Sequence, residues 1–203
     1  MNIVIVDYGM GNIKSIQSTL KYLGVEQVSL SADYDTLHKA DKIILPGVGS
    51  FGKAMSQIRE RGIDKTLSDL VLGKQKPLLG ICLGMQLLGK SSTEDGNNAG
   101  LGFVDADVIK FDNTHMKVPH VGINQVHVNR ACKIYEGFQD DPDFYFVHSY
   151  KMVSDQDINQ SMCEYGGEFI ASFEQDNIAG VQFHPELSQN NGLKLLKNFI
   201  GKL

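Results

Sequence analysis

Hydrophobic positions in the first half of the chain alternate between short apolar runs and helical spacing. The runs at residues 3–6, 42–45 and 77–82 are typical of buried strands. Residues 12–23 place apolar side chains at helical spacing, and a helical pattern broken at Gly62 follows the second run to about residue 72. Strands that alternate with helices favour parallel pairing in a sheet covered on both faces, with ligands bound at the carboxyl ends of the strands.

The second half of the chain has a different pattern. Residues 118–128, 143–153, 161–165 and 168–173 are short, alternating and bounded by turns, so we expect antiparallel strands or hairpins added to the sheet. Residues 180–184 predict one more strand, residues 192–202 a closing helix, and residues 91–100 a polar loop. We therefore expect one α/β domain over residues 1–203, with an open, mostly parallel sheet flanked by helices and extended by antiparallel strands.

Charge and composition exclude several classes of function. The formal net charge is −5, whereas general nucleic-acid binding needs a basic face. No apolar run approaches the ~20 residues of a membrane span, and the first residues lack the features of a signal peptide. Three cysteines without close spacing suit a reducing compartment. We expect a cytoplasmic protein that binds neither nucleic acid nor membrane.

The sharpest chemical signal is Gly80-Ile81-Cys82-Leu83-Gly84, between a strand pattern and a helix pattern. It has the form of a nucleophile elbow, in which a sharp turn exposes the nucleophile and glycines avoid collisions on either side. The helix N-terminus favours a thiolate, and the backbone N–H of Leu83 can hold an oxyanion. The alternative is an ordinary buried cysteine, which is our interpretation of Cys132 and Cys163, because neither has such a setting.

A thiolate nucleophile needs a base, and the base needs an orienting group. Phe183-His184-Pro185-Glu186 offers both, because residues i and i+2 of an extended segment point to the same side. By itself the motif is weak evidence, because a surface histidine beside a solvated acid is the commoner interpretation of such a segment. The competing histidines are at positions 38, 115, 120, 127 and 148. We rank His184 first because it ends an apolar strand, where active-site residues of open sheets lie.

The glycine-rich segment 46–52 follows a strand and precedes a helix. It lacks the spacing of a dinucleotide site and the lysine of a phosphate loop. Its backbone N–H groups could instead complete an oxyanion hole. No Cys/His pair has metal-ligand spacing, so we expect neither a metal nor a cofactor.

Several motifs together carry a resemblance to a known family. Pro-Leu-Leu-Gly-Ile-Cys-Leu-Gly-Met-Gln-Leu-Leu at 77–88 and Val-Gln-Phe-His-Pro-Glu at 181–186 resemble the class I (triad) glutamine amidotransferases. Stretches at 7–12, 45–51, 118–124 and 145–150 resemble the glutaminase subunits of imidazole glycerol phosphate synthase, in histidine biosynthesis. The similarity runs from residue 3 to the C-terminal helix.

The resemblance implies that the chain hydrolyses glutamine. Cys82 would attack the carboxamide, His184 would shuttle the proton to the leaving ammonia, and Glu186 would orient His184. The oxyanion hole would use backbone N–H groups of Leu83 and of the loop formed by Gly47, Val48 and Gly49. Residues implied to hold the amino-acid end of glutamine are Gln86, Glu94, Ser149 and Tyr150, although Glu94 is, from sequence alone, equally a solvated loop residue.

The resemblance also implies a heterodimer with a (β/α)₈-barrel cyclase subunit. The barrel takes the ammonia and makes imidazole glycerol phosphate and an aminoimidazole carboxamide ribonucleotide. Positions matched to the subunit junction are Asn12, Pro119, His120, Ile123, Asn124, Tyr145 and Leu187. Two of them depart from the family, which usually has tryptophan at the position of Ile123 and lysine or arginine at the position of Leu187.

These departures leave the partner open, since aromatic and charged residues are common interface anchors. One alternative is a glutaminase subunit that serves a paralogous amidotransferase of surface-polysaccharide amidino-sugar synthesis. Another is a stand-alone cysteine hydrolase, such as a peptidase or γ-glutamyl hydrolase, against which the glutamine-binding stretches argue. A third is a non-catalytic interaction module, against which the intact Cys82, His184 and Glu186 argue.

Overall fold

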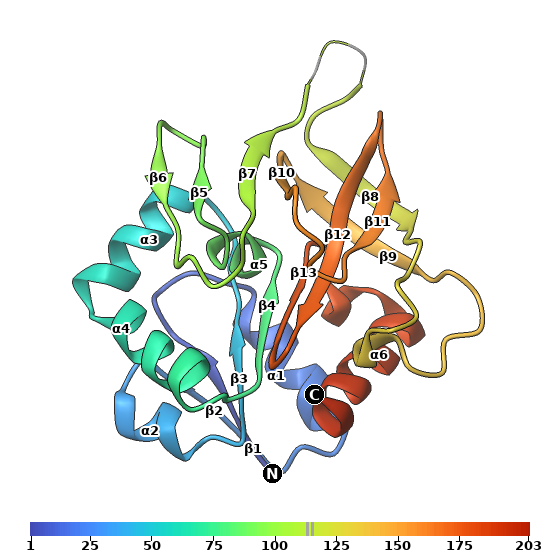
Figure 1. The fold of residues 1–203 in the computed structure, drawn as a ribbon. Coiled ribbons are helices and arrows are strands. Elements are labelled where there is room, and N and C mark those ends of the chain that lie inside the picture. The colour runs from blue at the N-terminus through green and yellow to red at the C-terminus, as the bar shows by residue number, and fades with distance from the viewer. Residues whose placement is uncertain (113, 115) are drawn as a thin grey trace.

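The computed structural model describes residues 1–112, 114 and 116–203. Its main sheet begins with five parallel strands in the order β2-β1-β3-β4-β13 (Figure 1). These are β1 (Asn2–Val6), β2 (Gln27–Ser31), β3 (Lys42–Leu45), β4 (Leu78–Ile81) and β13 (Ile178–Val181). The predicted parallel sheet is confirmed. β2 was missed, because its residues Gln-Val-Ser-Leu-Ser alternate along an edge strand and form no apolar run.

An antiparallel extension continues the sheet beyond β13. It comprises β12 (Glu168–Gln175), β10 (Tyr150–Val153), β7 (Asp107–Lys110), β5 (Ser91–Ser92) and β6 (Asn98–Ala99), with β11 (Ser161–Glu164) paired to β12. Within the extension, only the β5–β7 pair is parallel. The polar loop predicted at 91–100 therefore contains a short hairpin. Strands of two residues are too short to leave a period in the sequence.

Two predicted strands do not extend the main sheet. Within the described part of the chain, β8 (His120–Gln125) and β9 (Asp143–His148) pair only with each other, in a separate two-stranded sheet. The prediction that they are added to the main sheet was wrong. Residues 143–153 are interrupted at Ser149, so that β9 pairs with β8 while β10 joins the main sheet. Alternate β9 residues, Phe144 and Phe146, are buried in the hydrophobic core on the sheet face of Ile3 and Ile5, so this hairpin covers the sheet rather than lengthening it.

Helices cover both faces of the parallel strands. Those with predicted patterns are α1 (Ile13–Tyr22), α3 (Phe51–Glu60), α4 (Ile63–Leu67), the π-helix η1 (Ser68–Gly73) and α5 (Leu83–Leu87). Gly62 separates α3 from α4 with a φ of +66°, as predicted. α2 (Tyr34–Lys39) and the 3₁₀-helix η2 (Lys133–Tyr135) were not predicted.

In the C-terminal region, the helices begin at earlier residues than the sequence predicts. β13 ends at Val181, and His184 precedes a 3₁₀ turn, η3 (Pro185–Leu187), so the strand predicted at 180–184 was placed too late. α6 (Gln189–Lys202) then starts three residues before the predicted position 192. Its first turn is polar, and a hydrophobic period cannot locate such a start.

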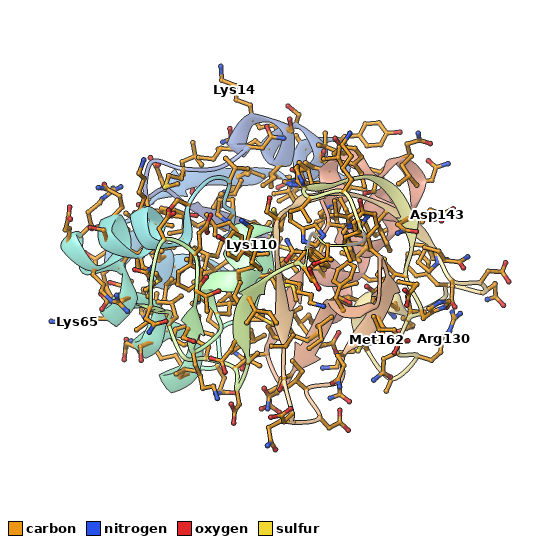
Figure 2. All side chains as sticks on the ribbon, turned by 90° about the horizontal axis from the view of Figure 1, so that it is seen from above. Lys14, Lys65, Lys110, Arg130, Asp143 and Met162 are labelled. Carbon is orange, nitrogen blue, oxygen red and sulfur yellow. The ribbon has the colours of Figure 1, made fainter. Side chains whose placement is uncertain are left out.

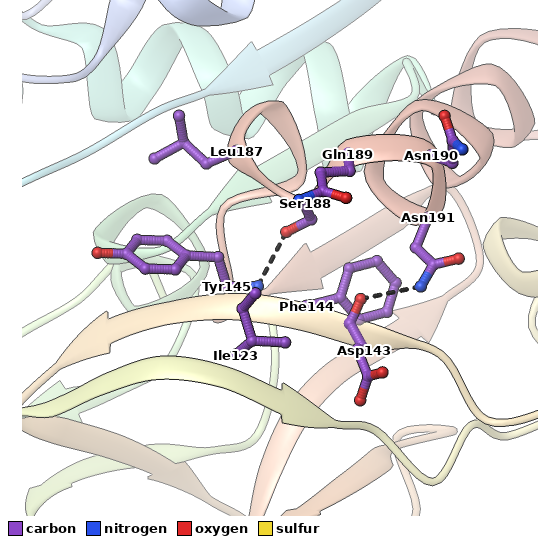
Figure 3. A pocket seen from close by; sticks show the side chains of 9 residues that line it. All are labelled: Ile123, Asp143, Phe144, Tyr145, Leu187, Ser188, Gln189, Asn190 and Asn191. Carbon is purple, nitrogen blue, oxygen red and sulfur yellow. Dashed lines mark hydrogen bonds between the residues drawn. The ribbon is translucent and has the colours of Figure 1, made fainter.

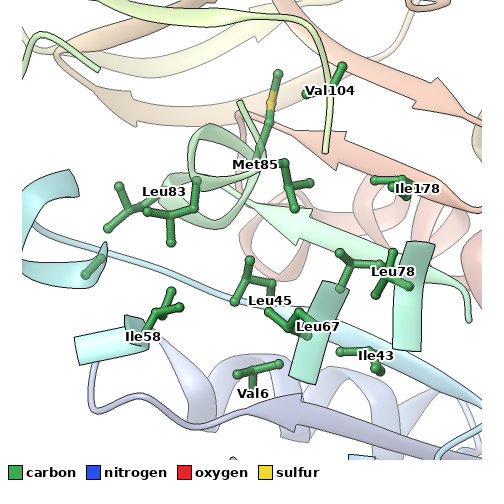
Figure 4. Close-up of a cluster of buried hydrophobic side chains, with 14 of the residues drawn as sticks. Val6, Ile43, Leu45, Ile58, Leu67, Leu78, Leu83, Met85, Val104 and Ile178 are labelled. Atoms are coloured by element: carbon green, nitrogen blue, oxygen red, sulfur yellow. The ribbon is translucent and has the colours of Figure 1, made fainter. Parts of the chain in front are cut away.

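Side-chain alternation along the buried strands builds two cores. Val4 and Val6 of β1 face the core shared with α2, α3, α4 and α5, part of which Figure 4 shows. Ile3 and Ile5 face the opposite core, shared with α1 and α6. Each fully buried side chain of this size contributes ~1.5–3 kcal/mol relative to exposure. The double burial explains why these strands read as continuous apolar runs.

Charged side chains lie mainly at the periphery, where Lys14, Lys65 and Arg130 project outward (Figure 2). Among the described residues, no helix combines the length and apolar character needed to cross a membrane.

Candidate active site

The carboxyl ends of the parallel strands lie at one edge of the sheet. The segments that leave them there are 7–12 after β1, 46–50 after β3, Cys82 after β4 and 182–186 after β13. The chemically distinctive motifs of the sequence therefore meet, as the prediction for an open parallel sheet requires.

Cys82 has a strained backbone at the junction of β4 and α5. Its φ of 54° and ψ of −113° are unusual for a residue with a side chain. The flanking glycines are required by close backbone contacts. A Cβ on Gly84 would lie 1.8 Å from the Leu45 carbonyl oxygen, and one on Gly80 would lie 2.8 Å from the backbone nitrogen of Met85. The predicted strand–elbow–helix geometry is present.

His184 and Glu186 form a buried pair. Nδ1 of His184 lies 2.9 Å from Oε1 of Glu186, and their side chains are 4% and 0% exposed. The predicted contact is present, but its expected cause was wrong, because the segment is not extended through Glu186. The 3₁₀ turn at residues 185–187 carries the carboxylate back to the ring. Nδ2 of Asn12 also donates to Glu186 Oε1 at 3.4 Å, which was not foreseen for a residue matched to the junction.

Cys82 and Glu186 keep His184 protonated. Burial lowers the pKa of His184, but hydrogen bonding and charge from the Cys82 sulfur and the Glu186 carboxylate outweigh burial and raise it to about 10. Its second ring nitrogen, Nε2, is buried and has no nitrogen or oxygen partner among the described residues, so that the Cys82 sulfur is the neighbour it interacts with. That nitrogen is therefore free to exchange a proton at the cavity.

The other two cysteines differ chemically from Cys82. Both are buried, and burial raises the pKa of each thiol to about 12. At neutral pH Cys132 and Cys163 are thus protonated and unreactive.

A loop after β3 approaches the sulfur from the other side. Val48 and Gly49 line the same cavity as Cys82 and Leu83. Leu83 is the first residue of α5, so its N–H has no partner within the helix. Tyr8 holds the base of the loop, because its hydroxyl donates to the Pro46 carbonyl at 2.6 Å.

Gly47 permits the close packing at this loop. A Cβ there would lie 2.6 Å from the Tyr8 hydroxyl and 2.8 Å from Cβ of Leu83. Burial, with a smaller effect of the Cys82 charge, raises the pKa of Tyr8 above its usual range, so Tyr8 remains a donor. Sequence reasoning missed Tyr8, although it stands in the Asp-Tyr-Gly-Met-Gly-Asn stretch.

The cavity has a volume of about 400 Å³, which suits a small-molecule substrate. The lining residues come from six separate stretches of the sequence between positions 48 and 184: Val48, Gly49, Cys82, Leu83, Gln86, Glu94, Pro119, Val147, His148, Ser149, Tyr150 and His184. The four residues expected to hold the amino-acid end of glutamine are among them. Pro119, which the sequence matched to the junction, also lies here.

Glu94 lines this cavity and also bonds to a neighbouring helix. Its Oε2 accepts a hydrogen bond from the Phe51 N–H at 2.8 Å, at the first turn of α3. Burial raises its pKa, and the Phe51 hydrogen bond opposes that effect. The remaining oxygen, Oε1, is available to a ligand. Glu94 thus connects the cavity to the helix that follows the 46–50 loop.

A hydrogen-bonded set behind the cavity was not predicted. Gln86 Nε2 donates to the Tyr150 carbonyl at 3.1 Å and to Oε1 of Gln182 at 2.8 Å. Nδ1 of His148 lies 2.8 Å from the same carbonyl, and its Nε2 lies 3.0 Å from Nδ1 of His120. Burial lowers the pKa of His120 to about 4 and that of His148 to about 3. Both rings are therefore neutral at physiological pH.

The positions matched to a subunit junction lie in different environments. Ile123, Tyr145 and Leu187 line a second, smaller pocket of about 220 Å³ (Figure 3). His120 is only 2% exposed and stacks on Tyr165. Asn124 donates to the Glu164 carbonyl at 3.0 Å.

The remaining histidines do not compete with His184. His38 and His127 are exposed and are not among the residues that line the cavity. His115 lies outside the described residues.

Comparisons with known proteins agree with this geometry. The family model described as Glutamine amidotransferase class-I matches residues 4–203. The chain is 42% identical over 199 residues to imidazole glycerol phosphate synthase subunit HisH 1 of Campylobacter jejuni (strain RM1221), covering 98% of each. It is 45% identical over 201 residues to subunit HisH of Escherichia coli (strain K12), covering 98% of this chain and 99% of that relative.

Solved structures share the fold at lower identity. A chain of PurLQS from Thermotoga maritima aligns with a TM-score of 0.76 and 19% identity, over 98% of this chain and 97% of that one. The crystal structure of a glutamine amidotransferase aligns with a TM-score of 0.72 and 21% identity, over 97% of this chain and 96% of that one. These likenesses confirm the predicted fold class. The chain belongs to the class-I glutamine amidotransferase family, and within it to the HisH subunits of imidazole glycerol phosphate synthase.

Proposed function

We propose that this chain hydrolyses glutamine to glutamate and ammonia through Cys82, His184 and Glu186, and supplies the ammonia to a cyclase partner in histidine biosynthesis. One observation carries the proposal. The strained Cys82 and the buried His184–Glu186 pair meet at one cavity, and the sulfur helps to keep His184 protonated.

The first half-reaction forms a thioester. The Cys82 sulfur attacks the carboxamide carbon, and the carbonyl oxygen becomes an oxyanion held by the N–H of Leu83 and an N–H of the loop containing Gly47, Val48 and Gly49. When the C–N bond breaks, His184 gives its Nε2 proton to the leaving nitrogen, which departs as ammonia.

The second half-reaction restores the enzyme. His184, now neutral, takes a proton from water, and the resulting hydroxide attacks the thioester carbon. The C–S bond breaks, glutamate leaves, and His184 regains its place between Cys82 and Glu186 as a protonated ring. The buried Glu186 carboxylate orients the ring throughout and stabilises its charge.

We assign recognition of the amino-acid end of glutamine to the polar residues that line the cavity besides Cys82 and His184. Glu94 has a free oxygen for the substrate ammonium, while Gln86 and the backbone of Ser149 and Tyr150 supply polar contacts. The cavity holds the ammonium and carboxylate groups of the substrate at a fixed distance from the reacting amide. It therefore selects an amino acid whose side chain has the length of the glutamine side chain.

The partner is expected to dock over the rim of this cavity. Five apolar side chains are exposed there: Val48, Val121, Ile123, Val147 and Leu187, at 41%, 55%, 67%, 40% and 46%. We call this set the apolar rim. Val121 lies opposite Val147, and Ile123 opposite Tyr145, in the β8–β9 register. The relatives are named as subunits of imidazole glycerol phosphate synthase, which supports a partner subunit. We propose that this partner is the (β/α)₈-barrel cyclase and that the two chains form a heterodimer.

A paralogous acceptor is the second candidate, because Ile123 and Leu187 line the same exposed pocket (Figure 3). Both residues that depart from the family pattern thus lie on one surface. Contacts at this surface would favour one partner barrel over another. In either case the three free cysteines suit a cytoplasmic location.

The Cys82→Ala variant tests the proposed chemistry. We expect it to lose glutamine hydrolysis by several orders of magnitude, as loss of a nucleophile does in triad enzymes. In the complex with its barrel, it should still support the reaction driven by ammonium salts, because the acceptor chemistry belongs to the barrel.

A glutamine-mimicking electrophile provides the chemical control. Mass spectrometry of the unmodified chain should find the label on Cys82 and on neither Cys132 nor Cys163. Labelling chiefly of another cysteine, or loss of the ammonia-dependent reaction in the folded Cys82→Ala complex, would contradict this division of roles.

A further inference from the structure

Gln182 lies behind the nucleophile and has no role in the chemistry described above. It is fully buried, one residue after β13, and its backbone N–H donates to the Ala171 carbonyl at 2.8 Å. Its side-chain amide reaches two groups of the site. Nε2 lies 3.8 Å from Sγ of Cys82, and Oε1 accepts from Nε2 of Gln86 at 2.8 Å.

One backbone carbonyl determines the orientation of both amides. The Tyr150 carbonyl can only accept, so the Gln86 group 3.1 Å away must be its NH₂. That NH₂ also faces Gln182, where only the amide oxygen can meet it. The NH₂ of Gln182 is consequently turned toward Cys82.

This orientation has consequences at both ends of Gln182. An N–H donor interacts more strongly with a negatively charged sulfur than with a neutral thiol. At the other end, the NH₂ of Gln86 is occupied by Gln182 and Tyr150. Its oxygen is then the atom that Gln86 can present to the cavity, as an acceptor for N–H groups of the substrate.

We propose that Gln182 is a positioning residue that holds the Cys82 sulfur in its reactive state and fixes Gln86 with its oxygen toward glutamine. The proposal rests on the glutaminase function proposed above and adds a residue to it. Because the side-chain amide of Gln182 contacts both Cys82 and Gln86, it affects the reactivity of the nucleophile and the recognition of substrate at the same time.

Other ionisable groups surround the sulfur and have to be kept constant in a test. His184 approaches from the segment after β13, Tyr8 from the segment after β1, and His148 lines the cavity from β9. Gln182 carries no charge itself. Its replacement therefore changes the surroundings of the sulfur while these three residues stay in place.

Two substitutions separate the two effects. Gln182→Glu keeps an oxygen toward Gln86 but places a second oxygen toward the sulfur. Gln182→Leu removes both contacts with little change in volume. Ser172→Ala is the matched control, since Ser172 is equally buried on the neighbouring strand and bonds to Tyr135 rather than to the site.

The measurements are the pH dependence of Cys82 alkylation by iodoacetamide and steady-state glutaminase kinetics of the complex. In both Gln182 variants we expect alkylation at pH 7 to slow by about tenfold or more, as for a lost hydrogen bond to a charged group. The alkylation profile should move to higher pH. KM should rise by about fivefold or more in Gln182→Leu, because Gln86 is no longer held, and should stay near the wild-type value in Gln182→Glu.

Each result decides the proposal. An unchanged alkylation profile in Gln182→Glu overturns the role at the sulfur, and an unchanged KM in Gln182→Leu overturns the role at Gln86. If Gln182→Leu does not fold, the alkylation profile of Gln182→Glu against Ser172→Ala still decides the first role. A wild-type complex that fails to hydrolyse glutamine refutes the proposed function, whereas the alkylation experiment continues to test Gln182.

Discussion

The three cysteines of this chain show how surroundings determine reactivity at the scale of a residue. All three are buried by area, with Cys82 at 7%, Cys132 at 3% and Cys163 at 0% exposure. Cys82 lines the active-site cavity and has His184 as a neighbour. Burial in apolar surroundings raises the pKa of the other two thiols, so nucleophilicity follows from neighbours rather than from exposure.

The protonation state of His184 is testable at this scale. In the wild-type chain we expect His184 to remain an imidazolium from pH 6 to 9, because its pKa is raised to about 10. In Cys82→Ala the sulfur that raises the His184 pKa is absent while burial, which lowers it, persists, so the His184 pKa should fall. ¹⁵N NMR titration of the ring nitrogens measures both values. Equal titration of His184 in the two proteins would contradict an ionic pairing with the sulfur.

Among the elements, the β4–α5 elbow depends most strongly on two glycines. α5 begins directly against β3, so that no Cβ fits between Gly84 and the Leu45 carbonyl. The strained φ of Cys82 is maintained by these contacts on both sides. The elbow is thus a property of the packed sheet, although its residues are adjacent in sequence.

A methyl group at position 84 should disrupt this element. In Gly84→Ala the new Cβ would meet the Leu45 carbonyl oxygen at 1.8 Å, and relief requires a backbone shift. We expect unfolding free energy to fall by roughly 3 kcal/mol or more, at or beyond the usual range for overpacking. Urea denaturation measures the change, and electrophile labelling of Cys82 should be lost in parallel.

Gly201→Ala is the matched control for this substitution. Gly201 lies in α6 with no atom within 4 Å of the added Cβ. Its unfolding free energy should change by less than about 1 kcal/mol, within the range of helix propensity, and labelling should be normal. A Gly84→Ala protein as stable as Gly201→Ala would show that the elbow is not held by this contact.

At the scale of the whole molecule, the residues of the apolar rim determine how tightly different partner barrels bind. Ile123 offers less area than the tryptophan usual in the family, and Leu187 offers no charge for an ion pair. We predict that Ile123→Trp combined with Leu187→Lys tightens binding to an ordinary histidine-pathway barrel by about 2 kcal/mol, the energy of one interface anchor. Binding to this chain's own barrel should stay equal or become weaker. Calorimetric titration of each chain against each barrel measures the four affinities.

The unmodified chain serves as the reference in those titrations. If it binds the ordinary barrel tightly and stoichiometrically, with full stimulation of the glutaminase, then the two departures do not mark a divergent partner.

The buried pair His120–His148 should make the free chain sensitive to acid. Both pKa values are lowered by burial, to about 4 and about 3, so the unfolded chain binds protons below about pH 6.5 that the folded chain does not. The contribution of these neutral histidines to the free energy of unfolding is therefore fully present above pH 6.5. It decreases toward pH 4, by roughly 1.4 kcal/mol per histidine and pH unit.

Variants at two histidines isolate this effect. His120→Phe keeps a ring between Phe146 and Tyr165 and removes one titrating group, so its unfolding free energy should depend less steeply on pH from 6.5 to 4. His38→Gln changes an exposed histidine and should retain the wild-type slope. Chemical denaturation at several pH values measures the slopes, and equal slopes for all three proteins would refute the assignment.

The amino-acid sequence by itself determined the parallel sheet, the elbow at Cys82 and the grouping of motifs at one sheet edge. These features are local in their origin. Doubly buried strands read as apolar runs, a sharp strand–helix turn needs Gly80 and Gly84, and parallel strands bring their carboxyl ends together. The roles of the site residues, and a single domain over residues 1–203, stay predictions.

Only the tertiary structure decided which distant groups touch. Gln182 is 100 residues from Cys82 and 96 from Gln86, and no period in the sequence records such a contact. The turn at 185–187, rather than an extended segment, brings Glu186 to His184. The β8–β9 hairpin lies over the sheet because Phe144 and Phe146 are buried in its core. Hydrophobic patterning specifies which face of an element is buried, whereas the partner of each buried polar group depends on how the loops of the whole chain pack.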